Sequence, residues 1–157
     1  MKKIKDIILN EGFKSMASHG IRFFTVENLA SSLSMSKKTI YQYFPKKEIL
    51  IKKVIEHRMK TQTDEFNKIL DSESDPITQF IMIREYNIKF AGKIKLDRLA
   101  DLKTRYPEIW KIIEKYRKNR ENIFTSIFKS AKKKKLLREN LKPEAAAKIY
   151  TNIFNST

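Results

Sequence analysis

Cysteine is absent from this 157-residue chain, and glycine, proline and histidine number only three, four and two. Without cysteine the protein has no disulfide and no thiolate metal site. Few glycines and prolines favour long helices over a many-turned sheet. No apolar run approaches the ~18 residues that a membrane-spanning helix needs, and Asn10 and Glu11 interrupt the apolar stretch near the start. We therefore expect an all-α, cytoplasmic protein without a secretory signal.

Groups that carry catalysis are also scarce. An enzyme needs a nucleophile, an acid–base pair or metal ligands brought together in one place. The two histidines, His19 and His57, stand alone, and the chain has no glycine-rich phosphate loop. We expect no enzymatic activity, no metal and no cofactor.

Acidic residues are few in comparison with basic ones, and the formal net charge is +16. Residues 1–60 contain 13 basic and 5 acidic residues, residues 61–110 contain 8 and 9, and residues 111–157 contain 13 and 4. Two basic regions therefore flank a neutral one, which indicates a polyanionic partner such as a nucleic acid or an anionic membrane. For the C-terminal excess, including Lys132–Lys135, a solvated surface without a partner remains an alternative.

Apolar periodicity and capping residues predict a succession of helices and no strand. In the first, Ile4, Ile8, Phe13 and Met16 form an apolar stripe near the helical period. Gly12 lies inside that helix at a cost of about 1 kcal/mol against alanine, which indicates close approach of another helix. The segment after Pro76 is apolar on most sides, so we expect it to be central. The expected ranges are 3–19, 26–33, 37–44, 47–70, 76–92, 95–106, a long helix from 107 that closes over 132–138, and 143–154.

The segment from Thr25 to Leu50 is the most informative part of the chain. Thr25 and Ser36 are suited to cap two short helices, and the turn between those helices contains Ser34. Pro45 ends the second of them, since the residue before a proline leaves the helical region. This order of helix, tight turn and helix is typical of a helix-turn-helix, whose second helix enters the major groove of DNA.

The second helix of this pair exposes side chains suited to DNA. Ile40 and Phe44 are expected to face inward, which leaves lysine, glutamine, threonine and tyrosine side chains outside. Lysine suits guanine and glutamine suits adenine, whereas hydroxyl and ammonium groups at helix N-termini bind phosphates. The expected DNA-binding residues are Thr25, Ser36, Lys37, Lys38, Thr39, Tyr41, Gln42, Tyr43 and Lys47.

Residues 8–55 resemble the N-terminal domain of the TetR family of bacterial transcriptional regulators. The resemblance rests on Thr25–Ala30, Met35–Tyr41, Tyr43–Phe44 and Lys47–Leu50. It implies that Thr25, Lys37, Thr39, Tyr41 and Lys47 contact DNA, and that Gln42 and Tyr43 reach bases or backbone. Two positions depart from the family pattern: Ser34 replaces a glycine of the turn, which predicts a strained or altered backbone, and Gly12 replaces a small alanine.

The same resemblance implies a three-helix head in residues 1–46 and a helical effector-binding and dimerisation domain in residues 47–157. Members are homodimers that bind palindromic operators and release them when a small molecule binds. An aromatic effector pocket is expected from Phe80, Phe90, Tyr106, Trp110, Tyr116 and Phe124, although simple core packing is an alternative for each. A dimer interface is expected from Ala146, Ile149, Tyr150, Ile153 and Phe154, with the family's final helix missing.

The sequence thus predicts a regulator that binds double-stranded DNA. The resemblance implies a repressor that a small molecule releases, and the aromatic residues suggest a hydrophobic effector. The sequence itself does not distinguish a repressor from an activator. A second class of function stays open, in which a basic helical protein binds an anionic membrane surface or nucleic acid without sequence specificity. A helix over residues 111–135 with one apolar and one basic side would suit such a membrane surface. Binding to liposomes distinguishes the two classes.

Overall fold

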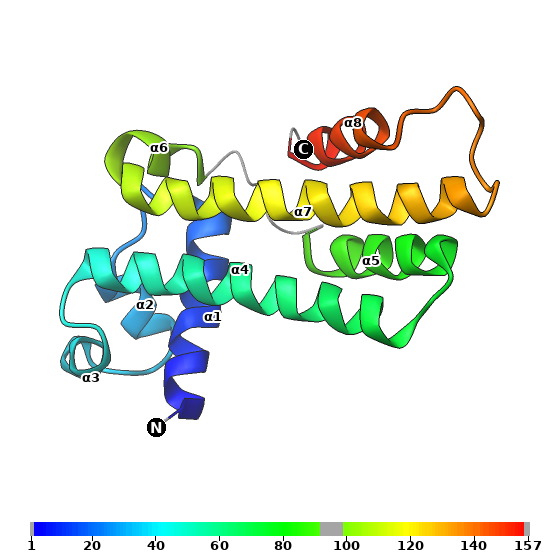
Figure 1. Cartoon of the computed structure of the whole chain (residues 1–157). Helices are drawn as coiled ribbons and strands as arrows, with labels where there is room; N and C mark the ends of the chain where they lie inside the picture. The colour runs from blue at the N-terminus through cyan, green and yellow to red at the C-terminus, as the bar shows by residue number, and fades with distance from the viewer. Residues whose placement is uncertain (1, 92–98, 156–157) are drawn as a thin grey trace. The chain divides into compact units, whose positions relative to one another are not determined.

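The computed structural model describes residues 2–91 and 99–155, and within them the chain forms eight helices and no strand (Figure 1). The prediction of an all-α fold is confirmed. The helices are α1 (Lys2–His19), α2 (Val26–Ser32), α3 (Lys37–Tyr43), α4 (Lys47–Ser72), α5 (Pro76–Ala91), α6 (Asp101–Arg105), α7 (Pro107–Lys133) and α8 (Pro143–Asn155).

The described residues divide into two compact units. Unit 1 comprises residues 2–61 and 99–113, and unit 2 comprises residues 62–91 and 114–155. The division falls inside α4 and inside α7. The functional boundary expected at residue 46 stays a prediction.

Unit 1 is built on close contact between α1 and α4 (Figure 1). Gly12 is buried in α1, and a Cβ atom at this position would lie 2.9 Å from Val54 Cγ2 of α4. This confirms that the glycine permits close helix approach. Ile8 and Met16 are fully buried in the same unit, whereas Ile4, at the start of the apolar stripe, is 36% exposed. The helix continues beyond the surface that α4 covers.

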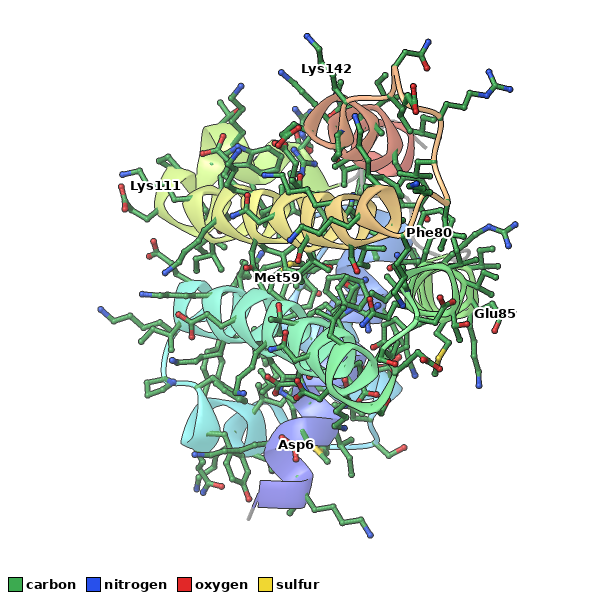
Figure 2. All side chains as sticks on the ribbon, turned by 45° about the vertical axis from the view of Figure 1, so that its right-hand side comes forward. Asp6, Met59, Phe80, Glu85, Lys111 and Lys142 are labelled. Atoms are coloured by element: carbon green, nitrogen blue, oxygen red, sulfur yellow. The ribbon has the colours of Figure 1, made fainter. Side chains whose placement is uncertain are left out.

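Unit 2 has an apolar core of Phe66, Ile83, Phe124, Ile127 and Ala147, one or two from each of its helices. Around this core, the ring centroid of Tyr150 lies 4.6 Å from the ring centroid of Phe124 and 4.9 Å from that of Phe80. In Figure 2 Phe80 points from α5 toward α7 and α8, whereas Glu85 points away from them.

The prediction that α5 is central was wrong. Four of its large apolar side chains are exposed by 39–51%, namely Ile77, Ile81, Met82 and Ile88. Only one side of α5 packs in unit 2, the side that carries Phe80, Ile83 and Asn87 at a spacing of three and four residues. High apolar content therefore did not indicate complete burial.

Candidate nucleic-acid interface

The geometry of the helix-turn-helix follows from its caps. The Thr25 side chain accepts a hydrogen bond from the Asn28 backbone N–H at 3.1 Å and so caps α2. At the other end, the Met35 N–H donates to the Ala30 carbonyl at 2.9 Å and the Ser34 N–H donates to the Ser31 carbonyl at 3.1 Å. These two bonds form a Schellman motif, which places Ser34 at the left-handed position with φ of 51°. The expected strain at this residue is confirmed.

The second helix, α3, is capped by Ser36. Its Oγ accepts from the Thr39 backbone N–H at 3.0 Å and lies 2.8 Å from the Thr39 hydroxyl. Ile40 is fully buried and Phe44 is 5% exposed, so both face inward as expected. The caps and these two anchors fix the rotation of α3, and thereby determine which side chains remain available to DNA.

The nine predicted DNA-binding residues lie at the N-caps of α2 and α3, on α3 itself, or at the start of α4. Lys37, Lys38, Tyr41 and Gln42 are exposed on α3, together with the capping residue Ser36. The remaining four are half-buried: Thr25, Thr39, Tyr43 and Lys47. Hydroxyls that serve as caps still have a proton to donate, so capping does not prevent Thr25 from bonding a phosphate.

A salt bridge joins the two helices of the motif. The Lys37 ammonium lies 2.7 Å from the Glu27 carboxylate, and more than half of each side chain is exposed. The hydrogen bond to Lys37 lowers the pKa of Glu27, and the same bond raises the pKa of Lys37. The Lys37 ammonium is therefore engaged with Glu27 in this structure.

Two features of this surface were not found from the sequence. Glu27 is ten residues from Lys37, so no helical spacing indicates their pairing. Phe23, in the loop before the Thr25 cap, is 71% exposed, although its apolar character predicts burial. It lines an open cleft of about 1090 Å³ in unit 1, beside His19 and Arg22. Arg22 is bonded there to Asp101, with Nε 2.9 Å from Oδ2.

The residues expected to form the effector pocket are spread over the chain. Tyr106 and Trp110 lie in unit 1, whereas Phe80, Tyr116 and Phe124 lie in unit 2. The Phe90 side chain falls outside the described part of the structure. Phe124 is 1% exposed and belongs to the core of unit 2, which agrees with the alternative of simple packing.

The residues expected to form the dimer interface lie on α8. Ile149 and Ile153 are 64% and 59% exposed, while Ala146 and Tyr150 of the same helix are half-buried. The Phe154 side chain lies outside the described part of the structure.

A basic head with a capped helix-turn-helix, joined to further helices, defines a helical DNA-binding regulator. Residues 8–54 match the model of the bacterial regulatory proteins of the tetR family. The resemblance predicted for residues 8–55 is thus confirmed by a match over residues 8–54.

Comparisons over most of the chain give further similar proteins. The chain is 24% identical over 152 residues to the uncharacterized HTH-type transcriptional regulator YvaF of Bacillus subtilis, covering 94% of this chain and 77% of YvaF. Its fold matches a TetR-family regulator from Agrobacterium tumefaciens with a TM-score of 0.82 and 17% identity, over 96% and 83% of the two chains. It also matches a protein from Saccharomonospora viridis assigned as a transcriptional regulator, in complex with choline, with a TM-score of 0.76 and 15% identity, over 99% and 83%.

Two kinds of feature are absent from the described residues. No helix there is long and apolar enough to cross a membrane. Residues 2–91 and 99–155 also contain no group of three or more histidine, aspartate or glutamate side chains arranged to hold a metal ion.

Proposed function

We propose that this chain is a repressor that binds a palindromic operator in double-stranded DNA as a homodimer. The observation that carries the proposal is the preformed helix-turn-helix, in which α3 is anchored by Ile40 and Phe44 and exposes Lys37, Lys38, Tyr41 and Gln42. Because its caps and turn are already hydrogen-bonded, DNA binding does not have to order the motif. Such a regulator works where the DNA is, in the cytoplasm.

Each DNA-facing group has a proposed role. Thr25 and Lys47, near the N-termini of α2 and α4, bind phosphates, where backbone amides and the helix dipole also favour anions. Lys38 and Gln42 are suited to base edges, and Tyr41 to phosphate and sugar. If a dimer neutralises about six phosphates, its affinity falls by about three orders of magnitude between ~50 and ~200 mM salt.

The rest of the chain serves assembly and control in this proposal. Residues 1–46 form the DNA-binding head and residues 47–157 carry dimerisation and effector binding. Ile149 and Ile153 give α8 an apolar side that a second copy can cover. A small molecule bound to residues 47–157 releases the operator by favouring a dimer geometry that does not fit it.

The test is selection of bound sequences from a random DNA pool at ~150 mM salt, where non-specific binding is weak. Enrichment of one inverted repeat, with half-sites one helical turn or a multiple of it apart, supports a dimeric sequence-specific regulator. Binding without enrichment, together with retention on anionic liposomes, would instead support the basic-surface alternative.

Variants then test the individual residues. Tyr41→Ala combined with Lys47→Ala is expected to abolish specific binding and to leave the circular dichroism spectrum unchanged. Lys103→Ala is the charge-matched control, because Lys103 is exposed in unit 1 but lies on α6. Operator binding retained by the double variant would refute the assignment of these two residues.

A further inference from the structure

The connection between α7 and α8 in unit 2 is strongly basic. Residues 132–142, called here the basic loop, contain six basic residues and one acidic residue. Figure 1 shows this connection as a loop that arches away from the two helices it joins. Five of its basic side chains are exposed, namely Lys133, Lys134, Lys135, Arg138 and Lys142.

Few acidic groups neutralise these cations. Glu139 is the one carboxylate of the basic loop. Lys134 lies 3.9 Å from Asp75, in the connection between α4 and α5. Within residues 2–91 and 99–155, no ion pair or hydrogen bond engages the side chains of the other four exposed cations, which are Lys133, Lys135, Arg138 and Lys142.

Lysines on the body of α7 have a different environment. Lys118 pairs with Glu121 on the same helix at 3.1 Å, and Lys129 pairs with Glu144 of α8 at 2.8 Å. A surface that is only solvated commonly mixes charges of both signs in this way. The concentration of unpaired cations in the basic loop therefore indicates a partner that supplies the negative charge.

The basic loop is also fixed by its own hydrogen bonds. The Lys132 ammonium donates to the carbonyl oxygens of Glu139 and Leu141, both at 2.9 Å. The Leu136 N–H donates to the Ala131 carbonyl at 3.0 Å and closes the end of α7. Because these bonds hold the backbone, a partner does not have to order the loop when it binds.

Two kinds of polyanion suit such a loop, and its residues favour DNA. Duplex DNA carries one negative charge per ~1.7 Å of its axis, so it can meet several cations at once. A bilayer surface would also need apolar anchors, and tryptophan and tyrosine are the residues enriched at bilayer interfaces. The basic loop contains no aromatic residue, and its large exposed apolar side chains are Leu136 and Leu141, exposed by 49% and 36%.

We infer that the basic loop binds the phosphate backbone of double-stranded DNA without reading its sequence. It is a second DNA-binding surface, formed by unit 2, whereas α3 belongs to unit 1. Ammonium and guanidinium groups bind phosphate oxygens, which carry no direct sequence information, so this contact adds affinity and not specificity. The inference rests on the proposed function only in the choice of DNA as the partner, since the contact needs neither an operator nor an effector.

The test measures binding of the full chain to a duplex of arbitrary sequence, by fluorescence anisotropy over a range of salt concentrations. The loop variant combines Lys133→Gln, Arg138→Gln and Lys142→Gln. Loss of three phosphate contacts should reduce the slope of the logarithm of the binding constant against the logarithm of the salt concentration by about two to three. Binding at ~100 mM salt should weaken at least about tenfold.

A charge-matched control variant removes three exposed lysines from the helices of unit 2. It combines Lys115→Gln, Lys118→Gln and Lys148→Gln. Both variants lower the net charge equally, so a general effect of charge would change their DNA binding alike. The control is expected to keep the salt slope of the wild type. All six substituted side chains are exposed, so both variants should keep the circular dichroism spectrum.

Three results would overturn the inference. The first is an equal change of slope in the loop variant and the control variant, and the second is an unchanged slope in the loop variant. The third is binding to phosphatidylglycerol vesicles that the loop variant loses while its duplex binding stays unchanged, because the partner would then be a lipid surface.

The selection from a random DNA pool tests sequence recognition separately. If no sequence is enriched but the loop variant has the smaller salt slope, the proposed function fails and this inference stands. If an inverted repeat is enriched but the loop variant behaves like the wild type, only this inference fails.

Discussion

Ser34→Gly is expected to stabilise unit 1. Ser34 has φ of 51°, a left-handed conformation that costs a residue with a Cβ atom about 1–2 kcal/mol. Glycine adopts it without that cost, but loses about 0.5–1 kcal/mol more backbone entropy on folding. The difference leaves a net gain of about 0.5–1 kcal/mol, which corresponds to about 1–4 °C in melting temperature for a chain of this length.

The assay has to report on unit 1, since a chain with two units need not unfold in one step. Amide hydrogen exchange at Met35 does so, because this N–H closes the motif by its bond to Ala30. Ser34→Gly is expected to slow its exchange, and the melting temperature of unit 1 is expected to rise. DNA binding by α3 should not change, as Ser34 lies before the Ser36 cap.

Two control variants make the test specific to the backbone conformation. Ser34→Ala keeps the Cβ atom and should show no gain, whereas Ser18→Gly, at an exposed position inside α1, should destabilise by about 0.5–1 kcal/mol. Lys135 ends α7 with the same pair of hydrogen bonds and φ of 56°, so Lys135→Gly should stabilise unit 2 similarly. If Ser34→Gly is no more stable than Ser34→Ala, the strain argument is refuted.

Three further predictions concern separate surfaces. Glu27→Gln releases Lys37 and removes a carboxylate from the surface proposed to face DNA. Fluorescence anisotropy should therefore show tighter operator binding, and the slope of the logarithm of the binding constant against the logarithm of the salt concentration should steepen by about one. The control is Glu108→Gln, which breaks the exposed pair with Lys111 and should have no effect. Gly12→Ala should be more favourable in a Val54→Ala background than in the wild type, by at least about 0.5 kcal/mol in a denaturant double-mutant cycle, and strict additivity would contradict the contact. Ile149→Glu with Ile153→Glu should raise the dimer dissociation constant at least about tenfold in sedimentation equilibrium, whereas Ile77→Glu, an exposed isoleucine on α5, should leave the dimer intact.

The head could be predicted in detail because its signals are local. A capping side chain accepts a hydrogen bond from the backbone amide three residues ahead, as Thr25 does from Asn28 and Ser36 does from Thr39. Both helix starts can therefore be predicted from residues that are close in the sequence. The proline at 45 and the serine in the turn act over equally short distances. Even the strain at Ser34 follows from the single fact that a side chain occupies a left-handed position.

Burial in α5 could not be predicted in the same way. Hydropathy predicts that Ile88 is more buried than its neighbour Asn87. The structure shows the opposite, since Asn87 is 3% exposed and Ile88 is 51% exposed. Helical periodicity shows which side chains share one side of the helix, but α5 carries apolar residues on more than one side. The choice among these sides is made by Phe66 and Phe124, which are distant in the sequence.

The buried hydrogen bonds between the helices of unit 2 show the same limit. Arg117 and Arg120 look like ordinary members of a basic helix, and a charge run usually lies on a solvated side. Arg120 becomes buried because Thr151, 31 residues away, accepts its hydrogen bond, and Gln62 finds Asn87 at a separation of 25. The sequence-based prediction of the effector site rests on aromatic residues instead, and aromatic side chains alone do not indicate whether a ligand is charged. Such contacts become evident only in the folded structure, because the spacing of residues along one helix cannot indicate a hydrogen-bond partner on another helix.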